Sequence, residues 1–380
     1  MAHSLYIHIP FCMKKCIYCD FYSIPGEYAL IEKYTDALCC EILLKKDSAR
    51  DLETVYIGGG TPTLLPEGHI ARLLQTVREV FTMKADAELT IEANPGTVSR
   101  EKLRRLRREG INRISIGIQS LVDRELAALG RIHSADDALL AVKAAQEAGF
   151  DNISLDLIYG IPGQTGKSWE YTLMKALETA PQHFSTYELT PEEETPLARG
   201  IAEGNIVLPC EEEVIGMYYH GMDILKGHGY LHYEISNFAK PGRQCLHNLN
   251  YWNRGEYLGI GAGAHSFYHG KRAANVRDAN RYVNQVNKGI LPVSEENEIT
   301  ESEAFKETVF LGMRKTEGIH VRTLPPLCPP LPRGGWGGEV KFKQAVAELI
   351  RDGLVEFKGD CLRFTDKGLV LSNEVLVRLL

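Results

Sequence analysis

Residues 8–21 read HIPFCMKKCIYCDF and place three cysteines, Cys12, Cys16 and Cys19, close together after a short β-branched run. Thiolates at this C-x-x-x-C-x-x-C spacing are typical of a metal centre, yet metals held by cysteine commonly take four protein ligands. The next position in the run where a fourth could fall is Phe21. We therefore favour a [4Fe–4S] cluster held by three thiolates, with one iron left open for a substrate.

Zinc is an alternative for the same three cysteines, and it would need a second pair of ligands further along the chain. Cys39 and Cys40 lie in a helical pattern, where adjacent side chains point about 100° apart and suit a single chelate poorly. Cys245 and His247 form another candidate pair, but nothing in their spacing ties them to Cys12. Unrelated cysteines are the remaining alternative.

The composition is that of an ordinary globular protein, with 380 residues of which 44% are hydrophobic and 24% charged. The formal net charge of −7 gives no electrostatic footprint for nucleic acid. The opening residues lack the basic segment followed by an apolar segment that is typical of a signal peptide. The sequence has no run of about 18 apolar residues, so we expect no transmembrane helix. We therefore expect a cytoplasmic protein whose cysteines are reduced.

Short β-branched runs alternate with longer segments of helical period over the first 190 residues. Ile31, Tyr34, Leu38 and Ile42 share one face of a predicted helix, and a later helix ends at Gly149. Strands are predicted at 4–9, 54–58, 88–93, 113–118, 152–160 and 184–189. Strands alternating with helices indicate βαβ units and a parallel sheet. Six such units predict an α/β fold, a partial (β/α)6 barrel of the TIM type.

The pattern changes near residue 295 and predicts two domains, 1–295 and 296–380. The second domain opens on a Thr/Ser-capped helix, and a Pro/Gly-rich stretch at 323–338 is not expected to hold regular structure. A helix, two strands joined at KGD and one closing helix follow, which is a small winged-helix-like arrangement. Seven Lys or Arg against six Asp or Glu over 340–380 leave no basic patch, so a DNA-reading role is disfavoured.

Polar or glycine-rich motifs follow the predicted strands one after another. In a β/α barrel the carboxyl ends of the strands share one face, where the chemistry is placed. Each motif alone has an ordinary explanation, such as a capping carboxylate or a turn former. Their joint placement indicates one mouth, lined by Tyr6, the GGGTPT segment (58–63), Glu92, Asn94, Gln119, Asp156 and Glu188.

Two glycine motifs resemble nucleotide sites without meeting their requirements. In GIPGQTGKS (160–168) the position of the first P-loop glycine is Ile161, and Pro162 removes a backbone N–H that the loop needs. GIGAGA (259–264) fits a loose Rossmann fingerprint but lacks the surrounding βαβ unit and a suitable acid downstream. A close backbone approach near a ligand explains the second motif equally well.

The cysteine motif after the first strand and GGGTP after the second resemble the radical S-adenosylmethionine (radical SAM) superfamily. The resemblance implies that the amino and carboxylate groups of S-adenosylmethionine complete the open iron, and that an electron from the reduced cluster cleaves its sulfonium. It implies Cys12, Cys16 and Cys19 as cluster ligands. By motif match it places Tyr6, Tyr18, Gly59, Gly60, Thr61, Glu92, Gln119, Arg131 and Asp156 around S-adenosylmethionine.

Motifs along nearly the whole chain, among them YIHIPFC, EANPGT, DLIYGIPGQT and CLHNLNYW, are similar to the family around oxygen-independent coproporphyrinogen III oxidase. They match best its haem chaperone branch, HemW. The oxidases carry a fourth cysteine at the position of Phe21 and an N-terminal extension. The chaperones carry Phe there and an H-N-x-x-Y-W motif, present here from His247 to Trp252. The segment 323–343 is richer in Pro and Gly than this family leads us to expect.

The resemblance implies a protein that binds haem and delivers it to apo-haemoproteins, such as membrane-bound respiratory enzymes. His247 is the expected ligand, because a neutral imidazole can ligate haem iron while Tyr251 and Trp252 offer flat apolar surface. Cys245 is an alternative ligand, and a buried histidine bonded to a carbonyl is the structural alternative. The rival function is radical oxidative decarboxylation of coproporphyrinogen III, and a DNA-binding regulator is a third.

Overall fold

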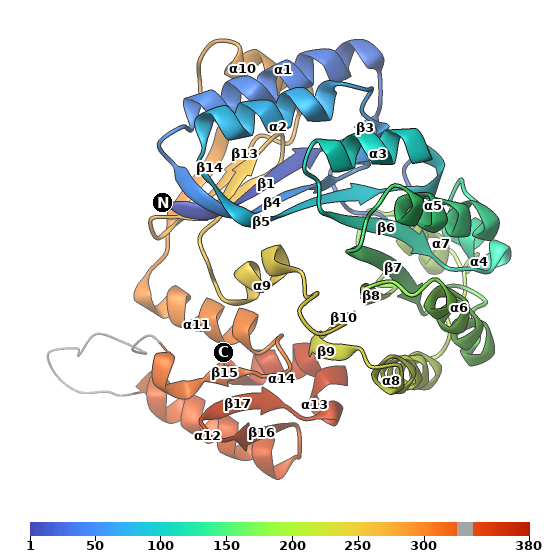
Figure 1. Cartoon of the computed structure of the whole chain (residues 1–380). Helices are drawn as coiled ribbons and strands as arrows, with labels where there is room; N and C mark the ends of the chain where they lie inside the picture. The colour runs from blue at the N-terminus through green and yellow to red at the C-terminus, as the bar shows by residue number, and fades with distance from the viewer. Residues whose placement is uncertain (325–336) are drawn as a thin grey trace, which may run out of the picture.

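The computed structural model describes residues 1–324 and 337–380, and it is built round one nine-stranded sheet in the order β11-β1-β4-β5-β6-β7-β8-β10-β9 (Figure 1). Six of these strands are parallel neighbours and match the six predicted strands. They are β1 (Ala2–Ile9), β4 (Ala49–Gly59), β5 (Met83–Ala93), β6 (Arg113–Gln119), β7 (Ile153–Tyr159) and β8 (His183–Glu188). The predicted partial barrel is therefore confirmed.

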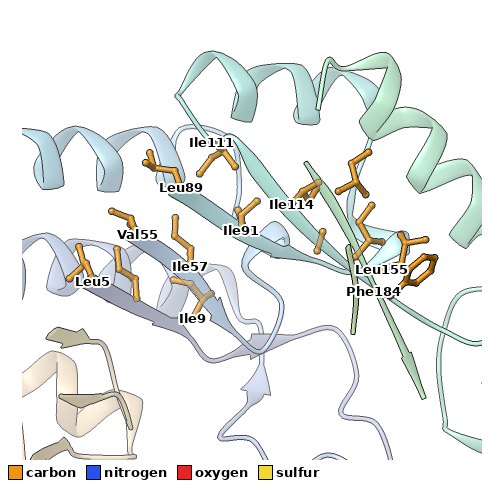
Figure 2. Packing of buried hydrophobic residues seen from close by; sticks show 14 of the residues in the cluster. Leu5, Ile9, Val55, Ile57, Leu89, Ile91, Ile111, Ile114, Leu155 and Phe184 are labelled. Atoms are coloured by element: carbon orange, nitrogen blue, oxygen red, sulfur yellow. The ribbon is translucent and has the colours of Figure 1, made fainter. Parts of the chain in front are cut away.

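Helices cover one face of this sheet because alternate strand residues on that face are apolar. Figure 2 shows such side chains, among them Val55, Ile57, Ile91 and Ile114, between the strands and the helices. Ile31, Tyr34, Leu38 and Ile42 are buried on α1, as predicted. The helices of this half of the chain are α1 (Tyr28–Leu44), α2 (His69–Val80), α3 (Arg100–Arg108), α4 (Asp123–Ala128), α5 (Ala135–Glu147), α6 (Gly166–Glu178), α7 (Pro196–Ala202) and α8 (Glu211–Gly227).

The opposite, concave face of the sheet is polar. Its inward-facing residues include Ser4, Tyr6, His8, Thr54, Tyr56, Glu88, Thr90, Glu92, Arg113, Ser115, Ser154, Asp156, His183 and Ser185. A core that only stabilised the fold would place apolar side chains there, as the helix-covered face does. The concave face is therefore the part of the barrel that is available for ligand chemistry.

Three strands from the second half of the chain extend the sheet at its two edges. β11 (Leu258–Ile260) pairs in parallel with β1, and it carries the GIGAGA glycines to the carboxyl end of that strand. At the other edge β10 (Asn237–Ala239) is antiparallel to β8 and pairs with β9 (Leu231–Glu234). The order begins with β11 and ends with β9, so the sheet is open.

A short helix, α9 (Leu246–Trp252), lies on the concave side of the sheet, away from α1, α2 and α3 (Figure 1). The Glu88 carboxylate accepts hydrogen bonds from the N–H groups of Leu246 (3.1 Å) and His247 (3.2 Å). Thr54 Oγ1 lies 2.7 Å from His247 Nδ1. These contacts fix the H-N-x-x-Y-W motif against β4 and β5.

The C-terminal segment has the predicted order of helix, helix, hairpin and helix, with three differences. A two-residue strand, β15 (Ile319–His320), lies between the first two helices and adds a third strand to the hairpin. The closing helix is two helices that meet at Leu371, and α12 begins at Gly337, inside the stretch expected to be irregular. The rest of that stretch, 325–336, lies outside the described residues. The elements are α11 (Glu301–Gly312), β15 (Ile319–His320), α12 (Gly337–Arg351), β16 (Val355–Lys358), β17 (Cys361–Phe364), α13 (Asp366–Val370) and α14 (Ser372–Leu379).

A second small sheet precedes this segment and is formed by β12 (His265–Tyr268), β13 (Lys271–Asn275) and β14 (Val293–Glu298), with α10 (Ala279–Val286) between the last two. β14 spans the predicted boundary at 295/296, and the division into domains stays a prediction. No helix in the described part of the chain is long and apolar enough to cross a membrane.

Candidate cofactor site

The cysteine loop leaves the carboxyl end of β1 and closes on itself. The two-residue strands β2 (Phe11–Cys12) and β3 (Ile24–Pro25) pair in parallel, and Ile24 N–H donates to the Pro10 carbonyl at 2.7 Å. Cys12, Cys16 and Cys19 are all partly buried within this loop. Burial raises the pKa of the Cys19 thiol to about 11, and the Cys16 and Cys12 sulfurs add to the rise. The three sulfurs are therefore close enough to interact electrostatically.

Two neighbours contact these sulfurs directly. Thr61 Oγ1 lies 3.6 Å from Cys12 Sγ, and Arg131 Nη1 donates to Cys16 Sγ at 3.4 Å. Gly60 packs beneath the loop, since a Cβ there would lie 2.8 Å from the Phe11 carbonyl oxygen and 3.0 Å from Cys12 Sγ. The glycine and the two side chains hold the end of β4 against the cysteine loop.

The cysteine loop carries a donor set that fits an iron–sulfur cluster. Ligands of one zinc ion must all lie about 2.3 Å or less from a single point. The thiolates of an iron–sulfur cluster bind different iron atoms and do not have to converge in this way. Three partly buried thiols with a cation and a hydroxyl beside them are a donor set suited to an iron–sulfur cluster.

Glu92 is held beside the glycine motif. Its carboxylate accepts hydrogen bonds from the Gly59 N–H (2.9 Å) and from the Tyr56 hydroxyl (2.8 Å). Burial raises the pKa of Glu92 to about 7, although both hydrogen bonds favour the ionised form. Gly58 leaves room for the carboxylate, because a Cβ there would lie 2.9 Å from Glu92 Cδ. A cationic group placed here would ionise Glu92 and pair with it.

Gln119 and Arg131 meet at the end of β6. Gln119 has φ +63°, a left-handed conformation that is uncommon for residues other than glycine and occurs often at functional sites. Arg131 Nη2 donates to the Gly117 carbonyl at 2.8 Å, while Arg131 Nε is buried without a partner. Arg131 thus donates to the Cys16 sulfur through Nη1 and to the β6 backbone through Nη2, and its Nε can still donate to a further acceptor.

The other predicted residues lie around the same mouth. Asp156 accepts hydrogen bonds from the Ser115 hydroxyl at 2.9 and 3.1 Å, and burial raises its pKa. Burial also raises the pKa of Tyr18. The charge of Arg131 opposes this rise and Cys16 adds to it, so Tyr18 lies next to both residues. The Asn94 side chain is used locally, since it accepts from the Gly96 N–H at 3.4 Å.

His8 belongs to this site although the motifs did not single it out. Its Nε2 lies 3.0 Å from the Tyr22 carbonyl oxygen, which can only accept, so Nε2 carries the proton. Nδ1 of the neutral ring then accepts from the Tyr6 hydroxyl at 2.9 Å. Burial lowers the pKa of His8 and keeps the ring neutral. His8 thereby joins β1 to the chain just after the cysteine loop, and only its place on the polar face of β1 could have indicated it.

His247 lies on α9, deeper in the barrel than the cluster loop. It is 1% exposed, and both of its ring nitrogens have partners, Thr54 Oγ1 on Nδ1 and the Tyr251 hydroxyl (2.9 Å) on Nε2. Burial and the charge of Arg113 lower the pKa of His247 to about 3, so the ring is neutral. It has the protonation state of a haem ligand, and Nε2 would coordinate iron only after Tyr251 moved away. Its assignment as a ligand stays a prediction.

Cys245, the alternative ligand, is fully buried, and its thiol lies 3.5 Å from Glu88 Oε1. Burial raises the pKa of Cys245 to about 12. Its assignment as the alternative ligand stays a prediction.

Comparison with known proteins agrees with this arrangement. Residues 6–176 match the family model described as the radical SAM superfamily. The chain is 37% identical to the heme chaperone HemW of Bacillus subtilis over 98% of this chain and 97% of the relative. It is 43% identical to heme chaperone HemW of Escherichia coli, over 69% of each chain. The structure superposes on coproporphyrinogen III oxidase (HemN) of Escherichia coli, a radical SAM enzyme, with a TM-score of 0.84, 26% identity, and coverage of 99% of this chain and 89% of that one.

The superfamily implies S-adenosylmethionine and a [4Fe–4S] cluster, and the residues gathered at the barrel mouth fit both groups. The identity to HemW of Bacillus subtilis is above one third over almost the full length of both chains, which assigns the sequence to one family within the superfamily. The chain belongs to the HemW family of radical SAM proteins.

Proposed function

We propose that the protein is a haem chaperone: it binds haem together with a [4Fe–4S] cluster and S-adenosylmethionine, and passes haem to apo-haemoproteins. The observation that carries this proposal is the similarity, over almost the full length of both chains, to a protein named heme chaperone HemW. The H-N-x-x-Y-W motif, packed on the concave face of the barrel, supports it. Respiratory enzymes are the recipients that we propose.

In this proposal Cys12, Cys16 and Cys19 hold the cluster. S-adenosylmethionine, when bound to it, supplies a sulfonium that a reduced cluster can cleave. The residues of this chain bind and orient the nucleotide: Glu92 with Gly59 receives an amino group, and the free Nε of Arg131 receives a carboxylate. Asp156 is held by Ser115 with acceptor capacity to spare for hydroxyl groups.

The rival activity, oxidation of coproporphyrinogen III, has support from the superposition on HemN. Phe21 weighs against it, since the oxidases are expected to carry a fourth cysteine at that position. Phe21 is 64% exposed, so the chain places a large apolar group in solvent beside the cysteine loop.

Two assays on anaerobically reconstituted protein separate these functions. Titration with haem should give a saturable Soret shift, and haem should move from the loaded protein to an apo-haemoprotein. Incubation with coproporphyrinogen III, S-adenosylmethionine and a reductant should give no protoporphyrinogen. Sustained conversion of coproporphyrinogen III, or the absence of any haem binding, would overturn the proposal.

A further inference from the structure

Arg113 is a buried cation at the centre of the concave face. It is 2% exposed, yet its Nε has no hydrogen-bond partner, and in the described part of the chain no carboxylate forms an ion pair with it. A buried charge without a partner is costly, and natural proteins rarely leave one. Burial would lower the pKa of Arg113, but Cys245 and Glu88 oppose this and hold it above its usual range. The side chain is therefore charged.

Glu88, the carboxylate that acts most strongly on Arg113, is occupied by other groups. Its two oxygens accept from the N–H groups of Leu246 and His247, and from the Cys245 thiol. Those bonds are used to hold α9, so they do not satisfy the guanidinium. Arg113 keeps donors for an acceptor that the described chain does not supply.

Flat rings lie in the same layer of the sheet as Arg113. Strand register places Tyr6 beside Tyr56, Tyr56 beside Thr90, and Thr90 beside Arg113. The Tyr6 and Tyr56 rings are stacked at 6.2 Å, and the His247 ring stacks on Tyr56 at 5.1 Å. Glu92 of the cofactor site is one inward-facing position above Thr90 on β5. The layer thus combines an aromatic wall with a cation, directly below the cofactor site.

Within this layer Tyr6 and Tyr56 are partly exposed, whereas Thr90 and Arg113 are buried. Tyr6, Tyr56, Glu92 and Asp156 face the concave side and are each partly exposed, and Tyr187 at the end of β8 is 43% exposed. A ligand that entered through the mouth of the barrel would meet the Tyr6 and Tyr56 rings before it reached the guanidinium. The group that matches both is a planar macrocycle with a carboxylate on its rim.

Resting on the proposed function, we infer that Arg113 is a binding residue for a carboxylate of the porphyrin, one of the two propionates if the ligand is haem. The guanidinium can donate two parallel hydrogen bonds to a carboxylate, and the ligand would then supply the acceptor that Arg113 lacks. The Tyr56 and Tyr6 rings, which stack on each other, would border the macrocycle.

The test compares two ligands and three substitutions. Soret titrations of the cluster-loaded protein would use haemin and haemin dimethyl ester, which has the same ring without the charges. The unsubstituted protein should bind haemin at least about tenfold more tightly, as expected for a charge-assisted pair. Arg113→Met should weaken haemin binding by the same factor and leave the ester unchanged, while Arg113→Lys should keep part of the difference.

Arg107→Met is the matched control, since Arg107 donates to the Gly149 and Ile111 carbonyls outside the concave face. It removes one positive charge and should leave the preference for haemin intact. Equal affinity of the unsubstituted protein for haemin and its ester would overturn the inference, and so would a preference that survives in Arg113→Met. Thermal unfolding checks the fold of Arg113→Met, and if that variant does not fold, an unreduced preference in Arg113→Lys overturns the inference. Failure to bind either ligand would instead contradict the proposed function.

Discussion

The imidazole of His8 lies in the space that a side chain at Gly59 would occupy. A Cβ on Gly59 would fall 2.5 Å from His8 Cε1 and 2.6 Å from Nδ1, and Gly59 has φ +115°. The absence of a side chain at this position therefore allows two things at once. The His8 ring reaches the Tyr22 carbonyl after the cysteine loop, and the Gly59 N–H reaches Glu92.

Gly59→Ala should destabilise the protein by about 1–3 kcal/mol from backbone strain alone, and the clash with His8 adds to this cost. Displacement of His8 should also loosen the cysteine loop, so iron should be lost faster to a chelator. Gly96→Ala is the control, because a Cβ at Gly96 meets nothing within 4 Å and its φ is not left-handed. Denaturant unfolding and iron release are the measurements, and equal behaviour of the two variants would refute the account of Gly59.

Binding of S-adenosylmethionine should depend on the ionisation of Glu92. Its folded-state pKa of about 7 lies above the ordinary value of 4.5, so the group must lose a proton to pair with an ammonium. Affinity should be constant above about pH 8 and should fall below pH 7 by a factor that approaches tenfold per pH unit, until Glu92 becomes protonated in the complex as well. Isothermal titration in buffers of different ionisation enthalpy should also show proton release at pH 6. A flat profile from pH 8 to pH 6 would be incompatible with this role.

The same pKa shift gives a stability prediction of opposite sense to that of an ordinary salt-bridged carboxylate. The folded ligand-free protein binds the Glu92 proton more tightly than the unfolded chain does. The contribution of Glu92 to the free energy of unfolding is therefore full below about pH 4.5 and is lost as the pH rises to about 7. Glu92→Gln removes this titration. Urea unfolding of the unsubstituted protein and of Glu92→Gln should show that the variant loses less stability between pH 5 and pH 8. An equal loss in both proteins would contradict the prediction.

Tyr251 should compete with haem iron for Nε2 of His247. Removing the hydroxyl in Tyr251→Phe eliminates one hydrogen bond, worth about 0.5–1.5 kcal/mol, and frees that nitrogen. If His247 is the ligand, haem affinity should rise by up to about tenfold in Tyr251→Phe and the Soret position should change in His247→Ala. A Soret spectrum unaltered by His247→Ala would remove His247 as the ligand.

Arg131 should tune the cluster through its contact with Cys16. An N–H donor and a positive charge next to a ligand sulfur stabilise the reduced cluster, so Arg131→Leu should lower its reduction potential by an amount on the order of tens of millivolts. Arg124→Leu, an exposed position on the neighbouring helix α4, is the control. Redox titration followed by electron paramagnetic resonance reports the potential, and equal values for both variants would show that the Arg131 contact has no electrostatic effect.

The local pattern of the first 190 residues is strong enough to predict the barrel. Period-two runs end in polar motifs and period-3.6 runs end in glycines, so each βα unit is visible within about 30 residues. The edges of the sheet were not predicted, because β11 pairs with β1 across about 250 residues of sequence and no local signal encodes such a pairing. The sequence does not indicate the break between α13 and α14 at Leu371, because both halves of the closing segment continue one helical pattern.

The candidate site shows the same division. Cysteine and glycine spacing indicated the cluster loop and the β4 motif, since both lie within short stretches of chain. The environment of His247 could not be predicted, because Thr54 and Glu88 reach it from strands more than 150 residues away. Tertiary contact alone shows that both nitrogens of this histidine are already engaged. A Cβ at Gly261 in the GIGAGA motif would lie 2.7 Å from the His8 carbonyl oxygen, so this glycine allows a close approach to the backbone of β1, while a ligand beside it stays a prediction.

The central claim is that three thiolates leave one iron of the cluster for S-adenosylmethionine. Its most direct test is electron paramagnetic resonance of the dithionite-reduced, reconstituted protein with and without S-adenosylmethionine, alongside iron and sulfide analysis. We expect close to four irons and four sulfides per chain, and a signal whose g-values shift when the nucleotide is added. A signal that does not respond, or a protein that holds zinc and no sulfide, would contradict it.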